Sequence, residues 1–405
     1  MPFRSTSSTD SQTLLALFAL AFGSFVISTS EFASMGLLPL FADGLGLSPA
    51  EASNAITAYA LGVMAGAPVI TIAAARMNKR TMLIALLVLA IAANLLTSVA
   101  NGLGLLVIAR FLSGLPQGAY FGAASVVATA IVGADRGGKA VALVMGGITV
   151  ATIVGAPVGT FIGQTLGWRG AYAIMAGLAV LATAATVFWL PHRSDFKGGS
   201  VSQELSALRR GTIWGMLVFT SIVVASLFAV YTFVGPLVTE TAGLPAFMTP
   251  IALALIGTGM AVGNIVGGNL ADRYRFRGLF IGFTATLAML AIMALTATVP
   301  TMLLIMLPAM GFTLMVAVPT IPLQMMKIAP EAPTLMGALN MAAFNIANAI
   351  GAAAGGLTVH AGFGFPSAIW AGLALTAAGL AFYVLLRPYL SRTLDQGYDA
   401  EFASS

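Results

Sequence analysis

The chain has 405 residues, of which 59% are hydrophobic and only 8% are charged, and its mean hydropathy is +0.98. Soluble domains carry about 25% charged residues, so this composition excludes an ordinary soluble protein and predicts a chain that crosses a membrane many times. The net charge of +5 does not indicate nucleic-acid binding, because the basic residues lie in short loops between apolar runs. The absence of cysteine excludes disulfides and thiolate chemistry.

Apolar segments follow one another along the whole chain, and their length of about 20 residues favours helices over the shorter strands of a β-barrel. The first segment is too long for the core of a signal peptide, so we expect it to be retained as a first span. We expect twelve spans, at residues 13–41, 51–75, 80–99, 104–131, 138–165, 170–190, 212–239, 247–271, 277–298, 301–328, 334–361 and 366–387.

The longest polar interruption, residues 191–211, divides these segments into two groups of six. The expected fold class is therefore an all-α membrane protein with an N-terminal half at 1–190, a cytoplasmic linker at 191–211 and a C-terminal half at 212–405. With both termini on the cytoplasmic side, sixteen of the eighteen Lys and Arg residues fall on that side. Such an excess of basic residues in inner loops is the usual signal for orientation.

One carboxylate lies inside the first apolar segment, in the stretch ISTSEFASMGLLP at residues 27–39. A charged acid at the centre of a membrane helix costs about 2.5–3.5 kcal/mol, and a low dielectric favours its neutral, protonated form. Glu31 is therefore a candidate proton carrier, and Ser24, Ser28 and Met35 share its helical face. The alternative is a static acid that is hydrogen-bonded to a neighbouring helix.

The fourth segment contains the only basic residue expected inside the membrane, Arg110. A guanidinium does not lose its proton in proteins, so Arg110 has to pair with another group or contact water. We expect Arg110 to tune the charge of Glu31, and Gln117 lies on the same helical face. The alternative is that Arg110 acts as a structural clamp between helices.

The uncharged polar residues of the other spans are candidates for contact with a transported solute. Buried amides and hydroxyls can equally hold membrane helices together, so each residue has this second interpretation. The candidates for the solute cavity are Ser28, Asn54, Tyr59, Gln117, Tyr120, Tyr231, Gln324, Asn340, Asn345 and Asn348.

The two halves repeat each other at an offset of 197 residues. Pro39 corresponds to Pro236 and Gly114 to Gly311, whereas Gly155 corresponds to Gly351 with a shift of one. A nearly constant offset over several spans indicates two related six-helix halves. In transporters, a binding site near the midplane between such halves is the expected arrangement.

Four short motifs identify a family. GGNLADRYRFR, residues 267–277, has a G-x-x-x-D-R pattern between spans 8 and 9, whereas the equivalent loop TIAAARMNKR, residues 71–80, has Thr71 and Ala75 in place of the glycine and the aspartate. Span 4 contains ARFLSGLPQG and span 5 contains GAPVGTFIG. Together they resemble the major facilitator superfamily, in its twelve-span drug:proton antiporter branch, and look most like bacterial arabinose-efflux and sugar-efflux permeases. The resemblance covers essentially all of residues 13–387.

The resemblance implies a proton-coupled secondary transporter of the bacterial inner membrane. It would export a small organic solute, such as a sugar or a drug, by alternating access, as a monomer that uses the proton gradient and no cofactor. It also implies residues that change contacts when the conformation switches, although tight packing or ordinary loop charges are the alternatives. These residues are Gly155, Pro157, Gly159, Gly268, Asp272, Arg273 and Arg277.

Other functions find little support in the sequence. The chain has no nucleotide-binding GxxxxGK[ST] motif, and its two histidines, His192 and His360, are far apart. We therefore expect no enzyme and no metal site. An uncoupled facilitator or importer of the same fold remains the main alternative, and a membrane receptor or scaffold is a remote one.

Overall fold

The computed structural model describes residues 7–74, 77–133, 136–192, 209–329 and 333–402, and these residues form helices without a strand. Before the linker the helices are α1 (Ser7–Leu45), α2 (Pro49–Ala73), α3 (Lys79–Ser98), α4 (Leu103–Val132), α5 (Gly137–Val150), the π-helix η2 (Ala151–Gly155) and α6 (Ala156–Trp189). After it come α8 (Gly211–Thr232), α9 (Val234–Pro236), η4 (Leu237–Thr241), α10 (Met248–Thr296), α11 (Pro300–Ala317), α12 (Thr320–Ile328), α13 (Pro333–Thr358), η5 (Val359–Phe363) and α14 (Ser367–Phe402).

Two of these helices are longer than one membrane crossing because each contains a reversal. In α6 the reversal is at Gly167, whose φ of 78° is open to glycine without strain. In α10, Gly259 and Gly263 approach residues 308 and 312 of α11 in the same order, whereas Thr286 bonds to Thr313 and Gly282 approaches Ala317. The two ends of α10 therefore run in opposite directions, as expected for spans 8 and 9.

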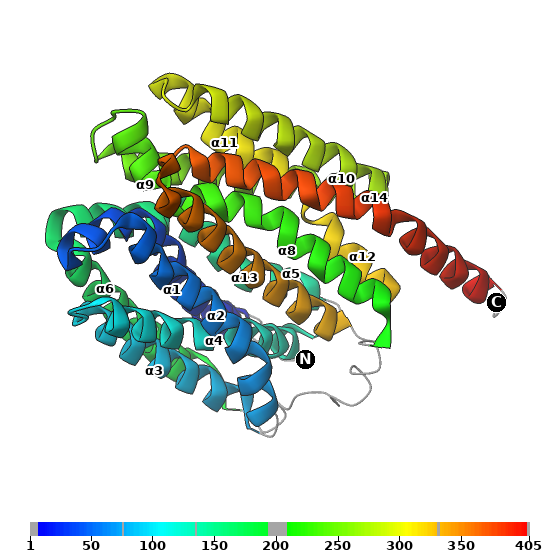
Figure 1. The fold of residues 1–405 in the computed structure, drawn as a ribbon. Helices are drawn as coiled ribbons and strands as arrows, with labels where there is room; N and C mark the ends of the chain where they lie inside the picture. Colours follow the sequence, from blue (N-terminus) through cyan, green and yellow to red (C-terminus); the bar gives the residue numbers. More distant parts are fainter. Residues whose placement is uncertain (1–6, 75–76, 134–135, 193–208, 330–332, 403–405) are drawn as a thin grey trace.

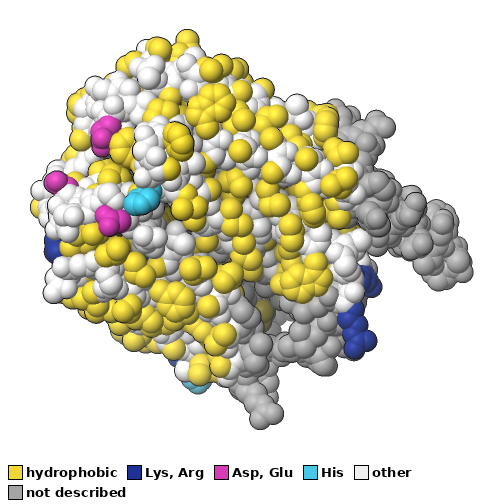
Figure 2. Space-filling view, viewed as in Figure 1, with side chains coloured by type: hydrophobic (Ala, Val, Ile, Leu, Met, Phe, Trp, Pro, Cys, Tyr) yellow, Lys and Arg dark blue, Asp and Glu magenta, His cyan; other side chains and the backbone are white. Residues whose placement is uncertain are grey.

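The bundle has the surface of a membrane protein. Ten helical segments within the described residues are long and apolar enough to cross a membrane, and one of them, Lys139–Trp189, contains the reversal at Gly167. In Figure 2 a broad hydrophobic band separates an end where acidic side chains gather from an end with a cluster of Lys and Arg side chains. Figure 1 shows the helices of both sequence halves side by side, with α1, α8 and α13 near the middle of the bundle.

The sequence repeat is also present in the helix packing, where equivalent glycines of the two halves make equivalent contacts. In the first half, a Cβ on Gly62 of α2 would lie 2.1 Å from the backbone oxygen of residue 111, and one on Gly114 would lie 2.0 Å from that of Tyr59. In the second half, Gly259 meets the backbone oxygen of Pro308 and Gly311 that of Ile256, so both partners keep the offset of 197. Each half therefore contains one helix pair whose backbones touch, as small residues permit in membranes.

The packing does not support the expected correspondence of Gly155 with Gly351 in the repeat. Gly351 of α13 lies against the backbone of residues 225 and 229 in α8, and the equivalent contact in the first half is that of Gly147 with residues 21 and 25 in α1. Sequence alignment alone could not detect this shift, because small residues recur every four positions in both helices. The offset of 197 nevertheless returns at the following turns, where Gly167 and Gly364 both have positive φ.

Several motif residues, or their side chains, lie outside the part of the chain that the structure describes. Ala75, Arg76 and most of the linker, residues 193–208, lie outside the described residues, as do the side chains of Asp272, Arg273 and Arg277. For Asp272, Arg273 and Arg277, the expected change of contacts when the conformation switches therefore stays a prediction. Gly268 is exposed, and a Cβ built on it would meet nothing within 4 Å.

Candidate functional site

Glu31 is buried within the bundle, with 5% of its side chain exposed. Its carboxylate accepts a hydrogen bond of 2.7 Å from Nε2 of Gln117, on α4 of the first half. Its other oxygen accepts a hydrogen bond of 3.0 Å from Nδ2 of Asn348, on α13 of the second half. The single acid of the first span therefore joins three helices and both halves of the chain.

Arg110 is completely buried on α4, about two turns before Gln117, but its hydrogen bonds do not go to the carboxylate of Glu31. Its guanidinium donates to Oγ of Ser30 at 3.1 Å and to the backbone oxygen of Ser30 at 2.9 Å. The guanidinium carbon also lies 4.5 Å from the ring centroid of Tyr59 and 5.2 Å from that of Tyr172. Arg110 is thus held by α1, α2 and α6, which agrees with the clamp interpretation and leaves its influence on Glu31 to act through space.

The contacts of Arg110 predict how the free energy of unfolding responds to a substitution at this position. A lysine at position 110 keeps the charge but cannot hold both oxygens of Ser30 or stack between two rings. Hydrogen bonds of charged groups contribute roughly 1.5–3 kcal/mol each, so we expect Arg110→Lys to lower the free energy of unfolding by about 2–4 kcal/mol. Thermal unfolding of the purified protein in detergent measures this loss.

Arg169 supplies the control for that measurement. It is exposed, donates one hydrogen bond to the backbone oxygen of Ala100 at 2.8 Å and stacks on Trp168. We expect Arg169→Lys to cost less than about 1 kcal/mol, because exposed charges contribute little. Equal destabilisation by the two substitutions would contradict the clamp.

Sequence reasoning missed three residues that complete this cluster. Ser30 lies next to Glu31 and donates to Oδ1 of Asn94 at 2.7 Å, and Tyr172 shares a hydrogen bond of 2.6 Å with Ser34. Asn94 was detectable, since it is an amide inside an apolar span. Ser30 and Tyr172 carried no comparable signal, because their role depends on which helices are neighbours.

The structure separates the candidates for solute contact into groups. The hydroxyls of Tyr59 and Tyr120 already donate to the backbone oxygens of Ile27 and Leu20, so these residues join helices. Asn54 is exposed on α2 and lies apart from the buried polar cluster. Five candidates besides Gln117 and Asn348 have a polar atom that is buried and has no hydrogen-bond partner among the described residues: Ser28, Tyr231, Gln324, Asn340 and Asn345.

The glycine stripe of span 5, Gly155 and Gly159, packs within the first half. Gly155 lies against Thr29 and Gly159 against Ala33, both on α1, and Pro157 follows the π-helix η2 at the start of α6. The contact of this region with the second half is made instead by the backbone of Thr152, which approaches Gly257 of α10. Sequence spacing identified the close packing correctly but not its partner.

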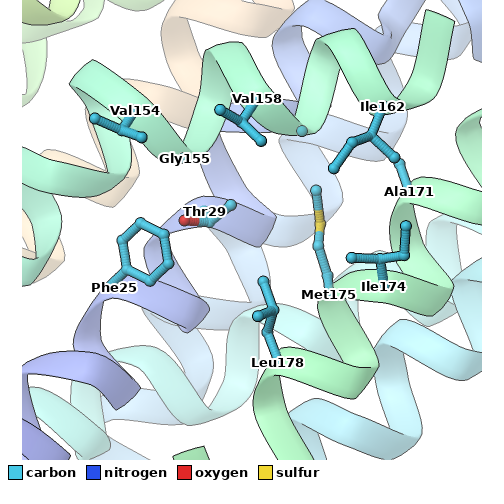
Figure 3. A pocket seen from close by; sticks show the side chains of 11 residues that line it. Phe25, Thr29, Val154, Gly155, Val158, Ile162, Ala171, Ile174, Met175 and Leu178 are labelled. Carbon is cyan, nitrogen blue, oxygen red and sulfur yellow. The ribbon is translucent and has the colours of Figure 1, made fainter. Parts of the chain in front are cut away.

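A cleft lies beside this stripe, with an empty volume of about 380 Å³. Its lining is apolar except for Thr29, and it comes from α1, η2 and both arms of α6 (Figure 3). Because every lining residue belongs to the first half, this cleft is not the expected midplane cavity between the halves.

The halves meet closely at the end of the bundle that we predict to face outward. Pro39 of α1 packs on Gly235 of α9, and a Cβ on Gly356 of α13 would lie 2.9 Å from Oγ of Ser53. Nε2 of Gln164 also donates to the backbone oxygen of Ala246 at 2.6 Å. These contacts close the bundle between Glu31 and that end in this conformation.

Comparison with known proteins agrees with this architecture. The family model described as Major Facilitator Superfamily matches residues 20–343. The chain belongs to the major facilitator superfamily. It is 37% identical over 371 residues to the inner membrane transport protein YdhP of Escherichia coli (strain K12), covering 89% of this chain and 94% of that protein.

Other relatives extend this picture. The putative transporter AraJ of Escherichia coli (strain K12) is 29% identical, over 90% of this chain and 92% of AraJ. A chloramphenicol resistance protein of Streptomyces lividans is 30% identical, over 90% of this chain and 94% of that protein. A solved bacterial homolog of the human lysosomal transporter Spinster shares the fold with a TM-score of 0.77 at 16% identity, covering 94% of this chain and 97% of that one. This member of the major facilitator superfamily is therefore a multi-pass membrane transporter and not an enzyme.

Proposed function

We propose that this transporter exports a small organic solute in exchange for protons, with Glu31 as the proton carrier. The observation that supports this proposal is the buried carboxylate of Glu31, which accepts hydrogen bonds from α4 of one half and α13 of the other. A carboxylate can exist there as an anion or as a neutral acid, and the two forms differ in what they bind. Arg110 remains the permanent charge beside it, and no cofactor is required.

The motion in this proposal is a rocking of residues 1–190 against residues 212–405. The outer layer of contacts between Pro39 and Gly235 and between Gln164 and Ala246 has to open for the solute to leave. Protonation of Glu31 from outside would then change its contact with Asn348, which crosses between the halves. We place both termini and the linker in the cytoplasm of a bacterial cell, and the protein in the inner membrane as a monomer.

The nature of the solute follows from the polar groups around Glu31. Besides the guanidinium of Arg110 they are amides and hydroxyls, and the described residues contain no second buried carboxylate, so an uncharged solute with several polar groups fits them. The name of the Streptomyces lividans relative suggests chloramphenicol as a first probe, and sugars remain a second class.

Everted membrane vesicles test this function directly. We expect vesicles with an acidic interior to accumulate radiolabelled chloramphenicol above the level of vesicles without the protein, and to lose that excess when an ionophore collapses the pH gradient. Excess uptake that is unchanged after the collapse would show an uncoupled facilitator instead.

A further inference from the structure

The two amides that hold Glu31 each have one unused polar atom. Nε2 of Gln117 and Nδ2 of Asn348 donate to the carboxylate, so their carbonyl oxygens, Oε1 and Oδ1, point away from it. Both oxygens are buried and accept no hydrogen bond from any described residue. Buried polar atoms in proteins are normally paired, so these two acceptors require a donor from elsewhere.

The direction of these hydrogen bonds follows from the charge of the acid. An ionised carboxylate can only accept, so it requires an N–H group from each amide. A neutral carboxylic acid has one O–H group that has to donate, and an amide can accept it only through its carbonyl oxygen. The terminal torsion of Asn and Gln has two broad minima, so an amide can turn over without moving its helix.

We propose that the charge of Glu31 sets which atoms Gln117 and Asn348 present to the solute. When Glu31 is ionised, both amides present carbonyl oxygens, and when Glu31 is neutral, one amide turns over and presents its NH₂ group instead. This inference rests on the proposed proton-coupled function and adds a substrate class to it. The solute of the ionised state is one that donates hydrogen bonds through hydroxyl or N–H groups.

This turning of an amide would couple proton binding to solute binding without direct contact between the proton and the solute. Solute donors can satisfy the carbonyl oxygens of both Gln117 and Asn348 only while Glu31 is ionised. Uptake of a proton replaces that acceptor by a donor, which faces the donor of the solute and weakens its binding. Proton and solute therefore weaken each other's binding, as antiport requires.

The other ionisable groups around Glu31 to consider are Arg110, Tyr59 and Tyr231. Arg110 on α4 keeps its proton and bonds to Ser30, and the hydroxyl of Tyr59 on α2 donates to Ile27. Tyr231 on α8 interacts electrostatically with Glu31, and its buried hydroxyl has no partner among the described residues. Tyr231 is therefore the competing acceptor for the proton of Glu31, and it has to be tested beside the amides.

Infrared difference spectroscopy between high and low pH tests the turning of the amides without any solute. The full-length protein in lipid nanodiscs should show the C=O band of a protonated acid at low pH, and Glu31→Gln should lack it. With ¹³C-labelled side-chain amides of asparagine or glutamine, we expect a label-sensitive band that appears with the same pH midpoint. This band should be absent in Glu31→Gln.

Variants then identify the amide involved. We expect the label-sensitive band to disappear in Asn348→Leu or in Gln117→Met. It should remain in Asn345→Leu, since Nδ2 of Asn345 donates to the backbone of Met341 on its own helix. A titrating Glu31 without any amide band, or an acid band altered only by Tyr231→Phe, would overturn the proposal. Absence of the acid band from the unchanged protein would instead refute Glu31 as the proton carrier. Failure of the amide proposal and failure of the proposed function are therefore distinguishable.

The substrate class is tested with a pair of probes, chloramphenicol and its diacetate, in which both hydroxyl donors are capped. One hydrogen bond corresponds to a change of roughly 2- to 10-fold in affinity. We expect chloramphenicol to bind tighter by this factor at high pH than at low pH, and the diacetate, whose remaining donor is its amide N–H group, to show a smaller dependence. Equal behaviour of the two probes, or no binding of either, would overturn the requirement for a donor.

Discussion

Vesicles that contain Glu31→Gln are expected to show no gradient-driven uptake above that of empty vesicles, although the variant folds normally. Glutamine has nearly the shape of glutamate and can bond to both amides, accepting from one and donating to the carbonyl oxygen of the other. It cannot take up or release a proton, so the gradient no longer acts on the transporter. The effect on the free energy of unfolding should stay within about 1 kcal/mol, because the hydrogen bonds are retained.

The measurement is the uptake of radiolabelled chloramphenicol by everted vesicles with matched amounts of protein. Glu51→Gln is the matched control, because Glu51 lies at the exposed start of α2 and bonds only to Ser48 among the described residues. We expect that variant to keep its uptake. Gradient-dependent uptake by Glu31→Gln at the level of the unchanged protein would exclude Glu31 as the proton carrier.

Replacing Gly114 with Leu is expected to have the largest effect on stability. The first added carbon alone would lie 2.0 Å from the backbone oxygen of Tyr59, and no side-chain movement can relieve a clash with backbone. Helices α2 and α4 would have to separate, at a cost of about 3 kcal/mol or more. We expect little folded protein in detergent extracts.

Gly122 on the same helix provides the comparison. It is exposed, and a Cβ at this position would meet nothing within 4 Å. We expect Gly122→Leu to be neutral or to stabilise the protein by up to about 1 kcal/mol, because glycine is a poor helix former. Apparent melting temperatures and yields of the two variants decide the matter, and similar values would show that α2 and α4 do not touch as described.

The residues that sequence could assign are those whose environment is set by their own helix. The apolar run around Glu31 predicted a membrane helix with a buried acid, and the offset between Gly114 and Gly311 predicted two similar helix pairs. The family followed from short motifs, two of them within spans 4 and 5 and one between spans 8 and 9. In each case the relevant pattern is local and repeats along the chain.

The residues that sequence could not assign depend on which helices are neighbours. Asn348 was one of ten solute candidates, and nothing in its own span indicates that it bonds to Glu31, which is 317 residues away. The spacing of Gly155 and Gly159 likewise shows that a helix has a small-residue face but not what lies against it. Arg110 likewise contacts Ser30, a residue with no distinguishing pattern.

The hydrogen bond between Glu31 and Asn348 has a thermodynamic consequence that holds whatever the solute is. Conformations that separate α1 from α13 lose this bond, so the proton occupancy of Glu31 enters their relative populations, at about tenfold for every 1.4 kcal/mol. Linkage is reciprocal, and the conformations must therefore differ in proton affinity by the same factor by which the proton shifts their populations. A measurement of proton binding in two trapped conformations would report the free energy that the gradient can deliver.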